Sequence, residues 1–230
     1  MKTPVSDRIL YEDNHLIVIN KEASEIVQGD KTGDKPLSEE VKSFLKKEYN
    51  KPGNVFTGVI HRIDRPVSGA VIFAKTSKGL SRMNELVKNR GLKKTYWAIV
   101  QNQPKEAEAT INSYLWRDQK KNKSFTVKKS KPGAKEAVLS YKLIGESQKY
   151  FLLDIDLKTG RHHQIRAQLA SIGCPIKGDL KYGAPRSNPD GSISLHARKI
   201  DFLHPIKKEE ISVTAPVPQD ELWRFFEGME

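Results

Sequence analysis

The sequence has a single cysteine, Cys174, and no long apolar run. One cysteine excludes an internal disulfide, which is typical of proteins from a reducing compartment, so we expect a cytoplasmic protein. No apolar stretch approaches the roughly 18 residues that a transmembrane helix needs. The first residues, MKTPVSDRILYEDN, also lack the apolar core of a secretory signal. We therefore expect a protein that does not associate with a membrane.

The sequence also lacks the common motifs of metal, nucleotide and hydrolase chemistry. It contains no HExxH, no paired CxxC, no GxSxG elbow, no GxxxxGK[ST] phosphate loop and no GxGxxG. His162 and His163 are adjacent, but neighbouring positions on a helix diverge by about 100°, so one ion would not bind both easily. We therefore predict neither a metal site nor a cofactor.

Positive charge, in contrast, is abundant. The 230 residues include 40 Lys+Arg against 28 Asp+Glu, which gives a net charge of +12. Such an excess favours a polyanionic partner, with nucleic acid ahead of an anionic membrane. The most basic stretch, 117–135, carries eight Lys/Arg and one acid, Asp118. We interpret it either as a loop that contacts backbone phosphates or as a solvated charged loop without a role.

Apolar periodicity predicts more strands than helices, with frequent hairpins. Strands are expected within 9–20, as two short strands around a turn, and at 69–74, 92–100, 138–144, 150–158 and 192–203. Helices are expected at 37–49, after an N-cap at Thr76, and across 160–173, where Ile165, Leu169 and Ile172 would face inward. This pattern is typical of an α+β fold with a mixed, largely antiparallel sheet flanked by helices and loops. Since no Gly/Ser/Pro-rich linker interrupts it, residues 1–230 are expected to form a single domain.

Residues 61–76, HRIDRPVSGAVIFAKT, contain one carboxylate, Asp64, between Arg62 and Arg65 and directly before an apolar strand. On its own, this segment is best explained by an acid that neutralises two arginines at a loop corner, because ion-pair networks outnumber catalytic acids. A reactive carboxylate is the other interpretation. A metal-dependent nuclease or phosphotransferase would need two more carboxylates nearby, and the segment offers only one.

Together with other stretches, this segment resembles the RluA-type pseudouridine synthases. HRIDRPVSGAVIFAK is similar to the family's HRLD-x-x-[ST]SG-x-x-x-x-AK, and KTYWAIV, from 94 to 100, to its K-x-Y-x-A-x-V. TGRHHQIRAQLASIGCPIKGD, from 159 to 179, is similar to TGR-x-HQIR-x-H-x-x-x-x-G-x-PI-x-GD. The opening ILYEDNHLIVINK and the closing LHA and TAPVP match as well. The resemblance covers almost the whole chain, in order and at the expected spacings.

The resemblance implies the pseudouridine synthase fold and an enzyme that isomerises specific uridines of ribosomal or transfer RNA after flipping the base. It implies that Asp64 is the nucleophile, that Arg166 is its ion-pair partner, and that Tyr96 stacks on the flipped uracil and helps to remove the carbon 5 proton. Burial disfavours the carboxylate anion and a nearby cation restores it. Asp64 could attack the ribose, attack the uracil ring or remove a ribose proton, and the sequence leaves these three routes open.

The other candidates are substrate-binding residues. Arg62, which directly precedes the Asp64 loop, would fill the space that the flipped base vacates or pair with the orphaned base. Ile63 and Leu195 would form the apolar face of the pocket. The remaining candidates would line the approach and hold phosphates, and they are His61, Arg65, Arg161 and His162.

The chain departs from the family pattern at two places. Lys21-Glu22-Ala23-Ser24 stands where the family usually has Lys-Pro-x-Gly, and Gln168 stands where a second histidine is usual. We expect no separate accessory RNA-binding domain, so RNA contact falls to the catalytic domain, acting as a monomer with no obligate protein partner. The alternative function is a catalytically silent RNA-binding protein on the same fold. It predicts the loss of Asp64, Tyr96 or Arg166, and all three are present.

Overall fold

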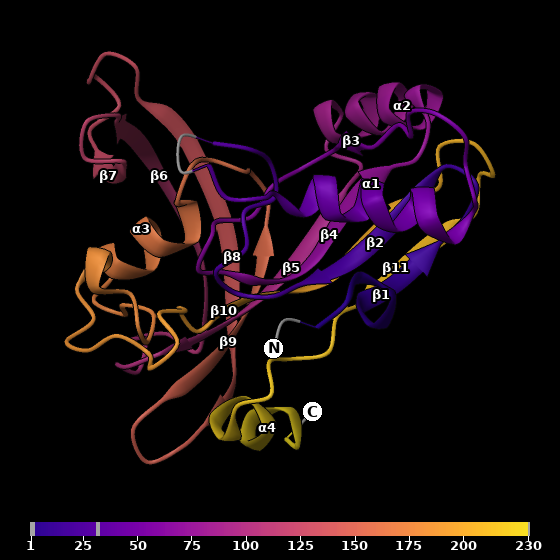
Figure 1. The fold of residues 1–230 in the computed structure, drawn as a ribbon. Coiled ribbons are helices and arrows are strands. Elements are labelled where there is room, and N and C mark those ends of the chain that lie inside the picture. Colours follow the sequence, from indigo (N-terminus) through magenta and orange to yellow (C-terminus); the bar gives the residue numbers. More distant parts are fainter. Residues whose placement is uncertain (1–2, 31–32, 230) are drawn as a thin grey trace. The chain divides into compact units, whose positions relative to one another are not determined.

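The computed structural model describes residues 3–30 and 33–229, and the chain divides there into two compact units (Figure 1). The first unit takes in the described residues of 1–93 together with 197–216. The second takes in the described residues of 94–196 and of 217–230. Each unit has its own sheet strands and its own apolar core, and each is described separately below.

The first unit is built on strands in the order β1-β2-β4-β10, with β3 paired to β4 and β11 paired to β10. The pairings β1/β2, β2/β4, β3/β4 and β10/β11 are antiparallel. The elements of this unit are η1 (Val5–Arg8), β1 (Ile9–Glu12), β2 (Leu16–Lys21), α1 (Leu37–Glu48), β3 (Gly58–Val59), β4 (Ser68–Ala74), α2 (Ser77–Lys88), most of β10 (Leu195–Leu203) and β11 (Glu210–Thr214).

The core of the first unit forms because its central strands are apolar at nearly every position. β4 is buried along its whole length, and β2 is buried at all positions but one. α2 begins after Thr76, whose side-chain oxygen accepts the Gly79 N–H, and its apolar face places Met83 in the core with no exposed surface. The predicted start of this helix is confirmed.

Gly69 allows β4 to approach β10 closely. Its φ is +114°, and a Cβ placed there would lie 2.4 Å from the carbonyl oxygen of Ala197 and 2.5 Å from its nitrogen. Only glycine fits such a contact, because every other side chain would collide with the backbone of β10. The glycine of the SG pair in the 61–76 segment is therefore required by the packing of the strand that follows Asp64.

The second unit contains a sheet in the order β5-β9-β8-β6-β7, with antiparallel pairing throughout these neighbours. Its elements are β5 (Lys93–Val100), β6 (Glu108–Asp118), β7 (Lys123–Val127), β8 (Lys135–Glu146), β9 (Phe151–Leu157), α3 (Gln164–Ser171), η2 (Leu180–Tyr182) and α4 (Glu221–Glu227). α3 contacts β6 and β7, and a small apolar cluster brings its Ala167 together with Leu115 of β6. α4 places Trp223 and Phe226 against Trp97.

The predicted α+β class with a largely antiparallel sheet is confirmed, whereas the single-domain organisation stays a prediction. Several elements were not expected from the sequence, namely η1, β3, β6, β7, η2, β11 and α4. The basic stretch 117–135 is not one loop, because it holds the end of β6, all of β7 and the start of β8. Among the described residues, no helix is long and apolar enough to cross a membrane.

The helix predicted across 160–173 is shorter than expected. α3 runs from Gln164 to Ser171, because His163 adopts a left-handed conformation with φ +51° and cannot belong to a right-handed helix. Ile172 follows the end of the helix and is 37% exposed, so its predicted inward position is wrong. Ile165 and Leu169 are buried, as the periodicity predicts.

Asp13 organises the turn between β1 and β2. Its Oδ1 accepts the N–H groups of His15 (2.7 Å) and Leu16 (2.8 Å). Its Oδ2 lies 2.9 Å from His204 Nε2 and 3.2 Å from Lys207 Nζ. Burial acts to raise the pKa of Asp13, but the hydrogen bonds from His15, Leu16 and Lys207 outweigh it and hold the pKa at about 2.

Acidification should therefore weaken the first unit through Asp13. Because its folded pKa lies below the ordinary value of about 3.9, the stabilisation is fully present above about pH 4 and is lost as the pH falls towards 2. We predict that Asp13→Asn lowers the free energy of unfolding at pH 7 by on the order of 2 kcal/mol. Denaturant unfolding of both proteins at pH 7, 4 and 3 measures this, and the difference should shrink towards pH 3. A difference that stays constant would contradict the prediction.

Candidate active site

The loop that carries Asp64 lies in the first unit, between β3 and β4. Ile63 and Val67 are buried on either side, and Asp64 itself is partly buried. The carbonyl oxygen of Asp64 accepts the Val67 N–H at 3.0 Å, which closes a tight turn before β4 begins. Ile63 is 8% exposed, and its predicted place in the apolar face of the pocket stays a prediction.

The end of β2 holds this loop by one backbone carbonyl. The carbonyl oxygen of Arg65 accepts a hydrogen bond from Lys21 Nζ at 3.1 Å and another from the Ser24 N–H at 2.9 Å. Lys21 Nζ also donates to the carbonyl of Glu22 at 2.8 Å. The residue next to Asp64 is thus fixed to a buried strand.

Lys21 is fully buried, which is rare for a lysine. Desolvation lowers its pKa to about 7, and the negative charges of Glu25 and Asp64 oppose this shift. Glu25 in turn accepts the Arg8 guanidinium at 2.7 Å and the Glu22 N–H at 3.0 Å. A network of buried charges therefore supports the Asp64 loop, and no role for Lys21 was predicted from the sequence.

The departure from Lys-Pro-x-Gly preserves the backbone shape at this point. Ser24, which stands at the glycine position, has φ +73° in the left-handed region that favours glycine. Its N–H makes the hydrogen bond to Arg65 in that conformation. Serine is strained there, so the hydrogen bond holds the residue in a conformation that it seldom adopts.

Three predicted substrate residues flank Asp64, and each has a partner within the first unit. The Arg65 guanidinium pairs with Asp34 at 2.8 Å, and both side chains are about half exposed. Arg62 is exposed and reaches Gln28 Oε1 only at 3.5 Å. His61 Nε2 accepts the Ile72 N–H at 3.2 Å, so this nitrogen carries no proton. Arg62 is therefore the side chain of the three that is bound most weakly to the protein.

The second unit supplies the other predicted residues. Tyr96 lies on β5, opposite Ile155 of β9, and is 6% exposed. Leu195 is the first residue of β10 and is 4% exposed. Burial lowers the pKa of Lys94, two positions before Tyr96. Leu195 is buried, and its predicted place in the apolar face of the pocket stays a prediction.

Arg166, on α3, is buried and forms a bidentate ion pair. Its Nε donates to Asp179 Oδ2 at 2.7 Å, and a terminal nitrogen donates to Asp179 Oδ1 at 2.8 Å. The carbon of the guanidinium lies 5.1 Å from the centre of the Tyr182 ring. Asp179 is the last residue of the third motif, and no role for it was predicted from the sequence. Its place as the last residue of that motif was the sequence signal that could have pointed to it.

The adjacent histidines also differ from expectation. Because His163 precedes α3 in a left-handed conformation, the two side chains do not diverge, and their rings stack at 3.8 Å. The pKa of His163 is lowered to about 2, mainly by burial and next by the positive charge of Arg166, so its ring is neutral. His162 Nδ1 lies 2.9 Å from Ser124 Oγ. Across the described residues no group of three or more His, Cys, Asp or Glu is placed to hold a metal ion.

Arg161 and Gln168 both connect to β-strands. Arg161 is exposed, and its Nε donates to the carbonyl of Glu136 at 2.8 Å. Gln168 Nε2 lies within 2.9 Å of both Ser113 Oγ and the Ala137 carbonyl. The glutamine that departs from the family pattern therefore joins α3 to β6 and β8 and has a structural role.

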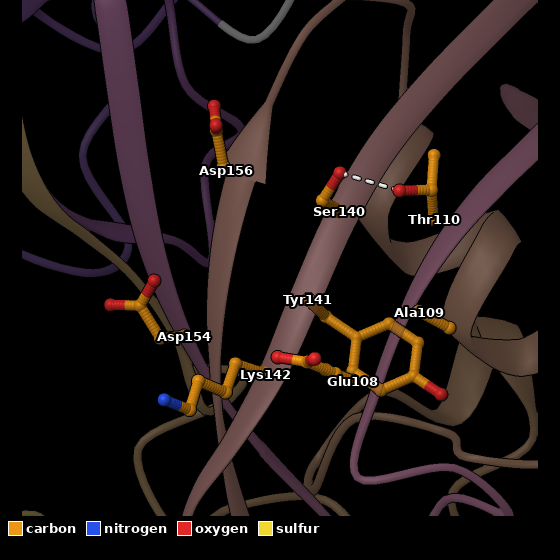
Figure 2. A pocket seen from close by; sticks show the side chains of 8 residues that line it. All are labelled: Glu108, Ala109, Thr110, Ser140, Tyr141, Lys142, Asp154 and Asp156. Atoms are coloured by element: carbon orange, nitrogen blue, oxygen red, sulfur yellow. Dashed lines mark hydrogen bonds between the residues drawn. The ribbon is translucent and has the colours of Figure 1, made fainter.

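A hollow of about 410 Å³ in the second unit contains none of the predicted site residues. It lies over β6, β8 and β9, and Figure 2 shows the carboxylates of Glu108, Asp154 and Asp156 with Lys142 along its walls. Three acids against one lysine would repel the phosphates of a nucleic acid. The hollow is therefore a poor candidate for the RNA site.

Comparison with known proteins gives the family. The pattern of the RNA pseudouridylate synthase family matches residues 15–171, which is more than half of the chain. The chain belongs to the RNA pseudouridylate synthase family. It is an RNA pseudouridine synthase, and therefore an isomerase. Asp64 lies in the first unit and Arg166 in the second, so their predicted ion pair would join the two and stays a prediction.

Individual relatives agree with this assignment. The chain is 34% identical to a Bacillus subtilis protein named uncharacterized RNA pseudouridine synthase YhcT, over 92% of this chain and 69% of that protein. It is 31% identical to ribosomal large subunit pseudouridine synthase D of Xylella fastidiosa, over 92% of this chain and 66% of that protein. The chain thus spans about two thirds of the length of these relatives. The structure of human RNA pseudouridylate synthase domain containing 4 has the same fold, with a TM-score of 0.79, 22% identity and coverage of 98% and 93%.

The buried lysine predicts a specific pH dependence. The folded pKa of Lys21 is about 7 and its ordinary value is about 10.4, so between these values the unfolded chain binds the proton and the folded chain does not. Stability should therefore rise with pH in this window, by up to about 1.4 kcal/mol per pH unit. We predict that Lys21→Met removes this rise and, by releasing the Arg65 carbonyl, lowers activity.

Unfolding in urea at pH 7.5, 8.5 and 9.5 tests the prediction, with Lys149→Met, at an exposed lysine, as the control. The control should follow the wild type at each pH. If the Lys21→Met curve ran parallel to the wild-type curve, the lysine would not titrate as described.

Proposed function

We propose that this protein converts specific uridines of ribosomal RNA into pseudouridine at Asp64, without a metal or a redox cofactor. Transfer RNA is the other substrate that the sequence resemblance allows. Ribosomal RNA is favoured by the names of relatives, among them ribosomal large subunit pseudouridine synthase D of Xylella fastidiosa and synthase C of Buchnera aphidicola. The net charge of +12 also supports an RNA substrate, as the names of the relatives do.

The reaction needs no external reductant or oxidant. The bond between uracil N1 and ribose C1′ breaks, a bond between C5 and C1′ forms, C5 loses a proton and N1 gains one. Atoms and electrons balance within the nucleotide, so a carboxylate and a proton acceptor are sufficient. Asp64 supplies the carboxylate, by attack on the ribose, by attack on the ring or by removal of a ribose proton.

Arg166 keeps this carboxylate charged in the proposed site. An arginine cannot lose its proton at ordinary pH and binds a carboxylate through a planar fork, which makes it a dependable counter-charge. Tyr96 stacks on the flipped uracil, and its hydroxyl serves in removing the C5 proton. Ile63 and Leu195 form the apolar surface against the base.

The nucleotide must leave its stack before it can react. Arg62 takes the vacated space, which its exposure and its weak contact with Gln28 permit. His61, Arg65, Arg161 and His162 line the approach of the RNA. The protein acts as a monomer in the cytoplasm, without an obligate protein partner.

One observation supports the proposal more strongly than the others. The loop of the lone carboxylate is anchored through the Arg65 carbonyl by a fully buried lysine, an arrangement that a surface ion pair would not need. Such a support fixes a reactive group in place before the substrate arrives. A silent RNA-binding protein would gain nothing from it.

Asp64→Asn should abolish turnover and leave the fold and RNA affinity intact, because the amide has nearly the same shape but is not an anionic nucleophile. Pseudouridine is mapped in total RNA from cells with and without the protein, and then in transcripts carrying the mapped sites, in the presence of a chelator. The wild type should modify the transcripts fully and the variant should not. Substantial activity of a carefully repurified variant would show that Asp64 is structural.

The same measurement distinguishes the proposed enzyme from the alternative, a silent RNA-binding protein. A silent RNA-binding protein would leave the pseudouridine map unchanged when it is deleted, although the purified protein would still bind RNA. Activity that a chelator abolishes, and that one divalent ion restores, would contradict the metal-free chemistry instead.

The basic stretch predicts a salt effect. Neutralising six lysines to glutamine should weaken RNA binding and flatten its salt dependence, by at most ~0.7–0.9 in log–log slope for each phosphate that the protein no longer neutralises. The rate at saturating RNA and the choice of uridine should change little, since phosphate contacts position the protein but read no sequence. The six residues are Lys120, Lys121, Lys123, Lys128, Lys129 and Lys131.

A matched control neutralises six exposed lysines of the first unit, Lys35, Lys46, Lys47, Lys51, Lys78 and Lys88. It makes the same change in net charge at other places and should alter the slope less. An unchanged slope in the 120–131 variant would mean that this stretch is solvated charge without a role.

A further inference from the structure

We propose that Asp179 is a positioning residue for the isomerisation, which acts by fixing the orientation and moderating the charge of Arg166. The inference rests on the proposed function, in which Arg166 is the counter-charge of the reactive carboxylate. It concerns groups that all lie in the second unit, and their geometry is described there.

Two hydrogen bonds fix the geometry of the ion pair between Arg166 and Asp179. Both carboxylate oxygens of Asp179 are used, at 2.7 Å and 2.8 Å, and they take the Nε edge of the guanidinium. The two side chains are 6% and 1% exposed, so water competes little for these hydrogen bonds. A planar fork held at two points cannot rotate, and its direction is therefore set by Asp179. Two of the five N–H donors of Arg166 serve this pair, and the other edge points away from Asp179.

The backbone of Asp179 provides a firm base for the pair. Its N–H donates to the carbonyl of Ile176 at 3.0 Å, and its own carbonyl accepts the N–H groups of Tyr182 (3.0 Å) and Ala184 (3.1 Å). The acid thus sits at the start of the short helix η2, in a turn closed on both sides. Any movement of Arg166 relative to this turn would break the bidentate geometry.

Tyr182, from the same turn, holds the second side of Arg166. Its ring centre lies 5.1 Å from the guanidinium carbon, within the range of a cation–π contact. Its hydroxyl is fixed in turn, 2.8 Å from the Ser124 nitrogen, which donates to it, and 3.0 Å from His163 Nδ1. One short segment, from Asp179 to Tyr182, therefore restrains the edge of the guanidinium by a carboxylate and its face by a ring.

Fold stability alone is a weak explanation for this arrangement. Burying two charges costs desolvation, and well-packed apolar residues often stabilise a core as well or better. The cost of desolvating the ion pair is explained if the reaction needs a charged group held in one orientation. The negative charge of Asp179 also offsets part of the positive charge of Arg166, so a carboxylate beside Arg166 keeps more basicity than it would beside a lone arginine.

Single-turnover rates at saturating RNA test the proposal with Asp179→Asn, Asp179→Glu and Arg166→Met. Asp179→Asn should lower the rate at least tenfold, with the Kd for RNA within threefold of the wild type. The acid limb of its rate–pH profile should move to lower pH, because removing a negative charge makes the reactive carboxylate easier to ionise. Asp179→Glu should recover part of the rate. Asp156→Asn, at a half-exposed acid of the same unit, is the matched control and should keep the wild-type rate.

Loss of the fold is separated from loss of positioning by the double variant Asp179→Asn/Arg166→Met. Because Asp179 acts only through Arg166, the double variant should react as slowly as Arg166→Met and no slower, whereas a general loss of the fold would make it slower than either single variant. A wild-type rate and an unshifted acid limb in Asp179→Asn would overturn the positioning role while the proposed function stood. Absence of pseudouridine formation by the wild type, or full activity of Asp64→Asn, would overturn the proposed function and this inference with it.

Discussion

The carbonyl oxygen of Arg65 accepts two hydrogen bonds from the end of β2 and the turn after it, and the position of Asp64 depends on them. Lys21 makes one of these bonds from a completely buried position, where desolvation lowers its pKa and the negative charge of Glu25 opposes this shift. Glu25 is paired in turn with Arg8 at 2.7 Å. A chain of buried charges thus extends from Arg8 to the residue beside the candidate nucleophile.

The second unit repeats this use of buried charge. Arg166 is held by Asp179 and covered by Tyr182, so that its direction is set before any substrate binds. In both units a residue of the proposed site is supported by a second buried charge, Lys21 for the Asp64 loop and Asp179 for Arg166. The proposed reaction, with one carboxylate and no cofactor, would have little besides electrostatics and orientation to lower its barrier, and a firmly held orientation fits this proposal.

The sequence predicted the elements with a strong local pattern. β2 and β4 are apolar runs, α2 has an apolar face with a capping threonine, and all three were found where they were expected. The start of α3 was missed because the left-handed conformation of His163 depends on contacts with Tyr182 and, through His162, with Ser124, which are distant in sequence. The roles of Lys21 and Asp179 were missed for the same reason, since their partners are brought together only by folding.

The pairing of Asp64 with Arg166 is tested most directly by a double-mutant cycle on the free energy of unfolding. The four proteins are the wild type, Asp64→Asn, Arg166→Met and the double variant, unfolded in denaturant at pH 7. Residues that share an ion pair show coupling energies of about 0.5–3 kcal/mol, and we predict a value of at least about 1 kcal/mol here. Effects that add to within about 0.3–0.5 kcal/mol would mean that the two side chains do not interact, and would contradict Arg166 as the counter-charge of the nucleophile.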